Sequence, residues 1–211
     1  PPCDPWRSLR EREEGDLRVL ATPPPPARAF LGRLRSHVDG SLVRGSRRTW
    51  IGPPVPAFVP LYEGSSELFL LDASEAGFFA AYRDPYGAPS CSLDGKGNCR
   101  VAVAHFDRCG ARQWSHVLDR VMSRPDPLEV QDLRLDRGVV YFNEACQGYS
   151  RDAGGRCSSL VAFDPLAGQV LWRTRALVSN NRILVLPEYV VAGYGFTAEP
   201  DFVHVVRRSD G

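Results

Sequence analysis

Between residues 66 and 211, hydrophobic positions form short apolar runs that are separated by turn signals. The runs are rich in β-branched and aromatic residues, as in "ELFLL", "GFFAAY" and "VAVAHF", and Gly, Pro, Asn and Asp fall between them. Apolar residues do not recur in this region with the 3.6-residue period of an amphipathic helix. The pattern therefore predicts an antiparallel all-β region from residue 66 onward.

Two stretches of this region share one motif. "HFDRCGARQW" (His105 to Trp114) and "AFDPLAGQVLW" (Ala162 to Trp172) each contain Phe-Asp, a turn that ends in Gly, and a Trp four residues after that Gly. A third copy begins at "HVVRRSDG" (His204 to Gly211) and reaches its Gly at the last residue of the sequence. Self-similarity of this kind predicts a structural repeat.

Each repeat is predicted to contain up to four strands, A to D, in sequence order. The predicted strands are 67–72, 77–83, 100–106 and 111–117 in the first unit, 129–135, 138–143, 158–163 and 169–174 in the second, and 182–186, 189–194 and 202–207 in the third. A four-stranded antiparallel unit that recurs every 40–50 residues or so is typical of a β-propeller blade. The predicted fold is a partial β-propeller with blades at 66–118, 128–175 and, incomplete, 181–211.

The motif residues have structural roles in this interpretation. They are Asp107, Gly110 and Trp114 in the first unit, and Asp164, Gly168 and Trp172 in the second. The Gly supplies a positive φ in the turn, and the Asp accepts hydrogen bonds from turn amides. Each Trp is expected to pack between successive blades, where a large aromatic surface stabilises most. A ligand-stacking platform is the alternative, but a residue that recurs once per unit favours architecture.

Residues 1–65 do not repeat and are predicted to be a proline-rich N-terminal extension. "DP" at Asp4-Pro5 suits the N-cap and first position of a short helix over 4–14. Apolar residues on one face predict a second short helix over 27–38. "GSRRTW" resembles the end of a motif copy and places a stray blade strand near 47–51.

Two pairs of cysteines bracket polar, glycine-rich loops, Cys91 with Cys99 and Cys146 with Cys157. We predict a disulfide across each loop, because neither has the close CxxC spacing or nearby His that a metal site needs. Each disulfide would stabilise the fold by roughly 3 kcal/mol in the chain-entropy account. Cys3 and Cys109 would then remain as a third pair. Disulfides predict an extracytoplasmic location, whether periplasmic, cell-surface or secreted.

Composition narrows the function classes. The chain has 26 Lys and Arg against 25 Asp and Glu, and a net charge of +1, which argues against nucleic acid as a partner. No apolar run reaches about 18 residues, so no transmembrane segment is predicted. Nucleophile-elbow, zinc-protease and P-loop motifs are absent from the sequence. We therefore predict no catalytic, cofactor-binding or metal-binding residues.

Two sets of polar residues are candidate ligands. The four histidines are His37, His105, His116 and His204. They are scattered along the chain, and His105 is expected to be an ordinary strand residue. The loops after the B strands are expected to contain Asn143, Glu144, Glu199 and Asp201. Their oxygens could bind a cation such as Ca²⁺ on one propeller face, but turn capping is the favoured role.

"LVAFDPLAGQVLW" resembles the PQQ-type repeat of quinoprotein-like β-propellers. The resemblance covers residues 66–211 and implies a bacterial protein, most similar to non-enzymatic, outer-membrane assembly-factor-like (BamB-like) propellers. The expected function is a non-catalytic extracytoplasmic scaffold, without a cofactor, that binds a protein partner at the cell envelope. The alternative is a fragment of a PQQ-dependent oxidoreductase that binds PQQ with Ca²⁺. Such dehydrogenases place adjacent cysteines beside the quinone, and this sequence has no Cys-Cys pair.

The number of predicted blades is too small to close a propeller. Propellers with this repeat typically close with about seven or eight blades, which removes open sheet edges. The sequence supplies two blades and most of a third. We therefore expect missing blades from a longer chain or from another subunit.

Overall fold

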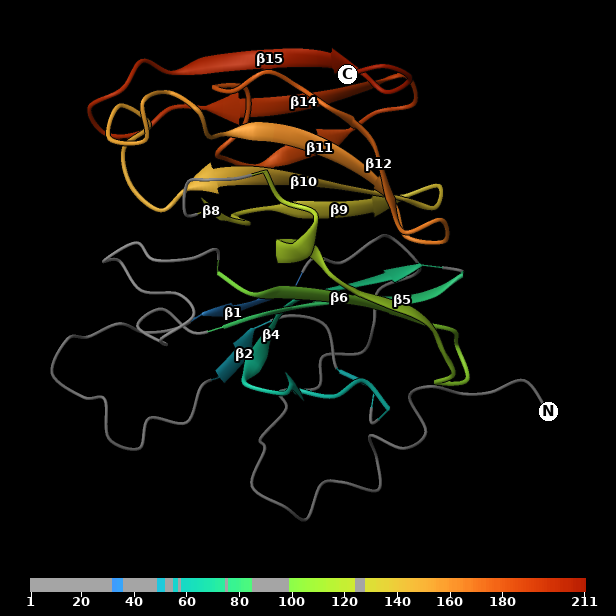
Figure 1. Cartoon of the computed structure of the whole chain (residues 1–211). Helices are drawn as coiled ribbons and strands as arrows, with labels where there is room; N and C mark the ends of the chain where they lie inside the picture. Colours follow the sequence, from blue (N-terminus) through green and yellow to red (C-terminus); the bar gives the residue numbers. More distant parts are fainter. Residues whose placement is uncertain are drawn as a thin grey trace, which may run out of the picture. The chain divides into compact units, whose positions relative to one another are not determined.

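A computed structural model describes residues 32–35, 49–51, 55–56, 58–74, 76–84, 99–123 and 128–211. These residues form antiparallel sheets joined by turns, with one 3₁₀-helix, η2 (Leu118–Arg120), and no α-helix (Figure 1). The all-β prediction is confirmed for this part of the chain. None of its helical residues forms a segment long and apolar enough to cross a membrane.

The chain divides into two compact units. The first comprises Pro1–Arg83 and Ala102–Ser115, and the second comprises Asp84–Val101 and His116–Gly211. The boundary between the units falls inside two strands, β6 (Val101–Phe106) and β7 (Arg112–Val117).

The first sheet has seven strands, in the order β2-β1-β4-β5-β6-β7, with β3 also paired to β4. The strands are β1 (Gly32–Arg35), β2 (Thr49–Ile51), β3 (Tyr62–Glu63), β4 (Ser66–Ser74), β5 (Gly77–Arg83), β6 (Val101–Phe106) and β7 (Arg112–Val117). Strands β4 to β7 lie side by side in sequence order, as predicted for strands A to D of the first repeat. The sheet is nevertheless wider than the predicted four-stranded blade, because β1 and β2 extend it beyond β4.

The helix predicted over 27–38 is wrong at Gly32–Arg35, which form β1. This strand pairs antiparallel with β4, where Arg33 lies opposite Leu70, and with β2, where Leu34 lies opposite Trp50. A helix of this length is marginal in water on its own, so pairing with two strands overrides the local periodicity. Strand β2 occupies the site of the predicted stray strand, and the helix predicted over 4–14 lies outside the described residues.

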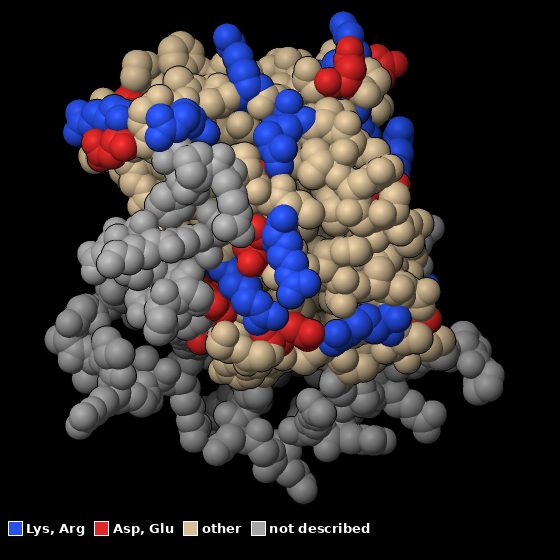
Figure 2. All heavy atoms as spheres, in the orientation of Figure 1, with Lys and Arg blue, Asp and Glu red and all other residues tan. Residues whose placement is uncertain are grey.

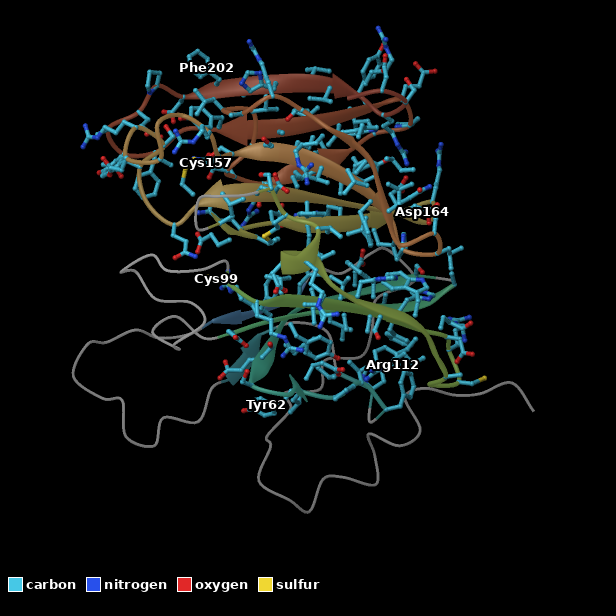
Figure 3. The ribbon with its side chains drawn as sticks, in the orientation of Figure 1. Tyr62, Cys99, Arg112, Cys157, Asp164 and Phe202 are labelled. Atoms are coloured by element: carbon cyan, nitrogen blue, oxygen red, sulfur yellow. A yellow bond between two sulfur atoms is a disulfide. The ribbon has the colours of Figure 1, made fainter. Side chains whose placement is uncertain are left out.

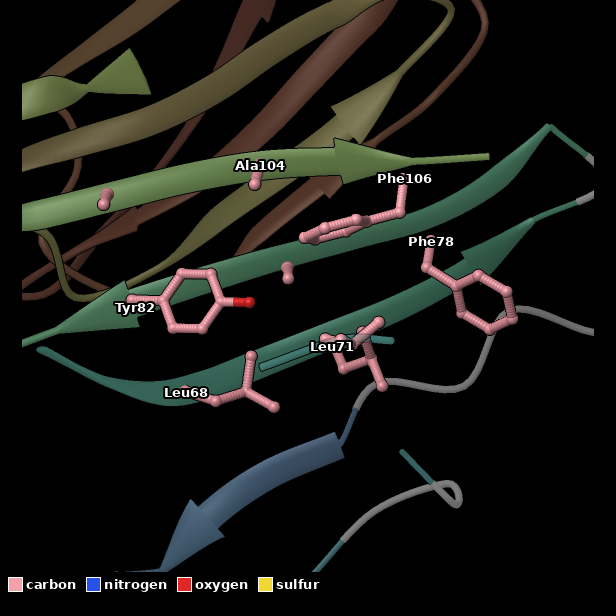
Figure 4. Close-up of a cluster of buried hydrophobic side chains, with 9 residues drawn as sticks. Leu68, Leu71, Phe78, Tyr82, Ala104 and Phe106 are labelled. Carbon is pink, nitrogen blue, oxygen red and sulfur yellow. The ribbon is translucent and has the colours of Figure 1, made fainter. Parts of the chain in front are cut away.

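One face of the first sheet carries a buried apolar cluster. Its buried members include Leu68, Leu71, Phe78, Tyr82, Ala104 and Phe106, from β4, β5 and β6 (Figure 4). Val59 is buried with them, and the Phe58 ring meets Phe78 edge to face at 5.5 Å between centroids. The segment before β3 therefore covers this face of the sheet.

The second unit contains two sheets. The first has five strands in the order β12-β11-β10-β8, with β9 also paired to β10, and the second has three in the order β13-β14-β15. The strands are β8 (Leu128–Glu129), β9 (Leu133–Asp136), β10 (Val139–Cys146), β11 (Ser159–Asp164), β12 (Gln169–Arg173), β13 (Ile183–Val185), β14 (Tyr189–Tyr194) and β15 (Phe202–Arg207). The third predicted repeat thus has its three predicted strands, β13 to β15, and β15 is an edge strand among the described residues.

The A strand predicted at 129–135 is split into β8 and β9, which pair with different parts of β10. Between them the backbone leaves the ladder and bonds to a side chain. The buried Asn143 Oδ1 accepts the N–H groups of Gln131 and Asp132, at 2.9 and 3.1 Å. A side-chain acceptor therefore takes these two amides at the bulge, while the Asp132 carbonyl still accepts the Asn143 N–H at 3.3 Å.

The two sheets of the second unit share one core. Tyr141, Leu160, Ala162 and Trp172 come from the five-stranded sheet, and Ile183, Val190, Ala192 and Val206 from the three-stranded sheet. Figure 1 shows these sheets stacked within the unit. Burial between facing apolar surfaces is the main force that holds them together.

Candidate interaction surface

The predicted motif Asp and Gly residues lie in the hairpin turns between β6 and β7 and between β11 and β12. Asp107 Oδ1 accepts two amides of its own turn at 2.8 and 2.9 Å, and Asp164 Oδ1 does the same at 2.8 and 3.0 Å. Gly110 and Gly168 have φ of +88° and +68°, a conformation that favours glycine. These side chains and backbones are therefore engaged in shaping the turns.

The two motif tryptophans lie in different surroundings. Trp172 is 9% exposed and belongs to the core between the two sheets, with its ring 5.9 Å from that of Tyr141. Trp114 is half-buried, and its ring stacks on His105 at 5.6 Å and lies 6.0 Å from that of Phe79. Both rings pack against side chains of their own compact unit, and the contact between successive blades expected of Trp114 stays a prediction.

The described histidines are dispersed. His105 lies on β6, His116 on β7 and His204 on β15, and His37 lies outside the described residues. Burial lowers the pKa of His105, and the charge of Asp107 opposes this shift only in part. The described part of the chain contains no group of three or more His, Cys, Asp or Glu placed to hold a metal ion.

The four residues predicted to share the B–C loops do not share them. Asn143 and Glu144 are fully buried residues of β10, so their predicted loop position is wrong. The Glu144 carboxylate accepts hydrogen bonds from Arg173 and Ser123, as near as 2.8 Å. Only Glu199 and Asp201 lie in a loop, after β14. Strand β10 extends beyond the apolar run, because the polar side chains of Asn143 and Glu144 are hydrogen-bonded to buried partners.

A disulfide joins Cys146 to Cys157, as predicted, and closes the loop between β10 and β11. Their Cα atoms are 5.4 Å apart. Cys99 and Cys109 are also disulfide-bonded. The predicted pairing of Cys91 with Cys99, and of Cys3 with Cys109, involves residues outside the described part of the chain.

The disulfide-closed loop is bound to the loop between β14 and β15, and we call the two loops, 147–156 and 195–201, the loop cluster. The Ser150 N–H and O–H donate to Glu199 Oε1 at 2.7 and 2.6 Å. The Tyr194 O–H donates to Glu199 Oε2 at 3.0 Å, and Ser150 Oγ lies 2.7 Å from the Tyr194 oxygen. One carboxylate therefore cross-links two loops.

The pKa directions identify this trio as a cross-link. Burial raises the pKa of Glu199, but hydrogen bonds from Ser150, Tyr194 and two amides outweigh it and leave the pKa below its ordinary value. Burial raises the pKa of Tyr194, and the Glu199 carboxylate adds to the rise. A carboxylate with a lowered pKa is a weak general base, and Ser150 is only 7% exposed. These directions are those expected of a carboxylate that accepts hydrogen bonds on both oxygens.

The loop cluster presents aromatic and cationic side chains at its surface. The Tyr149 and Phe196 rings meet edge to face at 5.1 Å, and the Arg151 guanidinium lies 4.7 Å from the Tyr149 ring centre. Phe196 is 47% exposed, and Arg151 is exposed. In Figure 3, Cys157 and Phe202 mark this end of the second unit, and Asp164 marks the opposite end.

Sequence reasoning missed Tyr149, Ser150, Arg151 and Phe196 as members of one surface. The predicted disulfide did indicate that the loop of Tyr149 to Arg151 is constrained. The contact with Phe196 joins residues that are far apart in sequence, so no local pattern reports it.

A scan against protein-family models found no match for this chain, and a search of curated proteins found none either. The resemblance to the PQQ-type repeat therefore rests on the motif residues themselves.

Proposed function

We propose that the protein is a non-catalytic extracytoplasmic scaffold, built of propeller-type blades, that binds a protein partner at the cell envelope through the loop cluster. One observation carries the proposal. The exposed Phe196 and Arg151 sit on loops that are held by the Cys146–Cys157 disulfide and the Glu199 cross-link. Aromatic residues and Arg are enriched at protein interfaces, and a preformed surface loses less conformational entropy on binding.

The charge distribution favours a protein as the partner. On the face seen in Figure 2, Lys and Arg side chains lie among Asp and Glu, so charges of both signs are mixed. The net charge is only +1. Binding of nucleic acid or of an anionic membrane surface needs a field of one sign, whereas protein interfaces accept mixed charge around an aromatic centre.

Two features support propeller-type blades and an oxidising compartment. Strands β4 to β7 and β9 to β12 each form a meander with the same Asp-and-Gly turn between the third and fourth strands. The Cys146–Cys157 disulfide is typical of proteins outside the cytoplasm. Further blades, from a longer chain or another subunit, would complete such a propeller.

Site-specific photocrosslinking tests the proposal. A benzophenone amino acid replaces Phe196 in cells that make the protein, and a matched control carries it in place of Leu166, which is 80% exposed in the β11–β12 turn. We expect one discrete protein adduct from position 196 and none from position 166. The same adduct from both positions, or none from either, would contradict binding through the loop cluster.

The oxidoreductase alternative is tested separately. The purified protein is incubated with PQQ and Ca²⁺, dialysed, and assayed for bound quinone absorbance and for dye-linked alcohol oxidation. We expect neither. Stoichiometric quinone binding would replace the scaffold proposal with the alternative function.

A further inference from the structure

The β13–β15 sheet has one covered face and one open face. On the covered face, Ile183, Val190, Ala192 and Val206 belong to the core shared with the five-stranded sheet. The opposite face, which we call the outer face, carries the apolar side chains of Leu184, Val191, Val203 and Val205, and the register adds Tyr189, Gly193 and Arg207 to it. Leu184 is 58% exposed, Val203 76% and Val205 65%. Exposed aliphatic side chains that lie next to one another in this way often mark an interaction surface.

The register shows that the outer face contains one apolar row across three strands. Leu184 lies opposite Val191, and Val191 lies opposite Val205. Residues that lie opposite one another in antiparallel strands point to the same side of the sheet. The row is therefore contiguous from β13 to β15.

The five-stranded sheet has an equivalent row, and that row is covered. There Tyr141 lies opposite Ala162, and Ala162 lies opposite Trp172. All three side chains belong to the core that the β13–β15 sheet covers. Trp172, on the fourth strand of the meander, completes the row.

The turn after β15 shows which residues of β15 correspond to those of β11. The Gly168 N–H donates to Asp164 O at 2.8 Å, and the Gly211 N–H donates to Arg207 O at 3.0 Å. Both glycines have positive φ, +68° and +84°. Ala162 precedes its turn glycine by six residues, and Val205 precedes its own by six. Val205 therefore corresponds to Ala162, and the side of β15 that corresponds to the β12 side of β11 has no neighbour among the described strands.

The edge of β15 that has no neighbour among the described strands carries backbone groups that can pair with another strand. The Arg208 N–H donates to Glu188 O on the β14 side. Because the direction alternates along a strand, the Val203 and Val205 amides point to the other side, where β15 has no neighbour among the described strands. An edge of this kind is a template for another strand.

We propose that the outer face and the free edge of β15 bind a further β-sheet of the same repeat type. The strand that precedes this sheet pairs antiparallel with β15 and becomes the fourth strand beside β13–β15. It places a large aromatic side chain beside Val205, as Trp172 on β12 lies beside Ala162. The sheet behind that strand then covers Leu184, Val191 and Val203, as β13–β15 covers the preceding row. This inference rests on the proposed propeller-type architecture. Edge-to-edge pairing of two β15 strands would leave both outer faces uncovered, so a second copy paired in that way is not the occupant.

A peptide in trans tests the proposal. The 211-residue protein is titrated with the peptide GQVLWRT, a copy of its own Gly168 to Thr174, and with the same peptide carrying alanine in place of tryptophan. Binding is followed by fluorescence anisotropy, and amide hydrogen exchange by NMR. We expect saturable binding, at least tenfold slower exchange of the Val203 and Val205 amides, and at least tenfold weaker binding of the alanine peptide.

A matched pair of variants places the binding. Val205→Arg puts a charge on the outer face and is expected to abolish binding, while Leu166→Arg, at an exposed turn position, is expected to leave it unchanged. Circular dichroism verifies that both variants are folded. Equal binding of the two peptides, or binding that Val205→Arg does not affect, would overturn the proposal.

Other results separate this proposal from its alternatives. A concentration-dependent dimer that protects the same amides without peptide would identify a second copy as the occupant and reject a further sheet. Absence of peptide binding, with a discrete adduct still formed from position 196, would reject the outer-face proposal and leave partner binding by the loop cluster intact. Peptide binding without that adduct would reject partner binding by the loop cluster alone.

Discussion

At the scale of single residues, Trp172 and Arg208 together connect the two sheets of the second unit. The Trp172 indole N–H donates to the Arg208 carbonyl at 2.8 Å. The Arg208 guanidinium lies 5.3 Å from the Tyr141 ring centre, donates to its hydroxyl at 3.0 Å and pairs with Asp136 at 2.7 Å. The end of β15 is therefore held to β9, β10 and β12 by both aromatic packing and polar contacts.

Replacing Trp172 tests this connection. Trp172→Ala removes a buried ring and leaves the Arg208 carbonyl without its donor, so we expect it to lower the free energy of unfolding by about 3–5 kcal/mol. Leu171→Ala, next to it and 48% exposed, is the matched control and should cost less than about 1 kcal/mol. Urea unfolding followed by circular dichroism measures both variants. Similar losses in the two would show that Trp172 does not stabilise the contact between the two sheets.

At the scale of secondary-structure elements, Glu144 fastens the connection between β7 and β8 to the sheet. Its carboxylate, fully buried in β10, accepts the Ser123 N–H at 2.9 Å and O–H at 2.8 Å. Arg173 on β12 donates to the same carboxylate and, at 2.7 Å, to the Val121 carbonyl. A buried carboxylate is stable only with such partners, so the segment around η2 and two strands form one polar unit.

Removing this carboxylate should therefore be costly. Glu144→Ala leaves Arg173 without its anion, and we expect a loss of about 3 kcal/mol. This is at the lower end for a buried pair, because the Arg173 side chain remains 30% exposed. Hydrogen exchange of the Ser123 amide should accelerate in the variant. Glu188→Ala, at an exposed position, is the control. An unchanged Ser123 amide in Glu144→Ala would contradict the anchoring role.

The loop cluster should loosen in acid. The pKa of Glu199 in the folded protein lies below its ordinary value of 4.5, so the unfolded chain takes up this proton first as the pH falls. The stability that Glu199 contributes is therefore fully present above pH 4.5 and is lost as the pH falls through the lowered pKa of the folded state. We expect the difference in unfolding free energy between the wild type and Glu199→Gln to shrink from neutral pH to about pH 3. A difference that grows in acid would contradict the cross-link.

Elements were predictable to the extent that they depend on neighbours in sequence. Strands β4 to β7 and β10 to β15 follow apolar runs between turn residues, and those signals are local. The split of strand A depends on the Asn143 side chain, and β1 depends on pairing with Leu70 and Leu71, so both needed tertiary information. The loop cluster was out of reach for the same reason, since Ser150 and Glu199 are 49 residues apart.

At the scale of the whole molecule, the two sheets of the second unit present apolar rows in the same way. Each meander offers an apolar row to the next sheet, through Tyr141 and Ala162 in one and through Val191 and Val205 in the other. The first row is covered by a sheet that the chain itself provides. The second row has no such cover among the described residues, and Val205 in it is 65% exposed.

Disulfides add a stabilisation that depends on the environment of the molecule rather than on its packing. The Cys146–Cys157 bridge spans 11 residues, and closing a loop of that length stabilises the folded chain by roughly 3 kcal/mol in the chain-entropy account. We expect the double variant Cys146→Ser/Cys157→Ser to unfold at a lower urea concentration by a corresponding amount. A thiol reductant should shift the wild type at least as far, because Cys99 and Cys109 are also bridged. Thiol titration of the unreduced native protein supplies the control. Four or more reactive thiols would remove both the disulfide contribution and the argument for an oxidising compartment, whereas a wild type free of reactive thiols that loses stability only on reduction would support both.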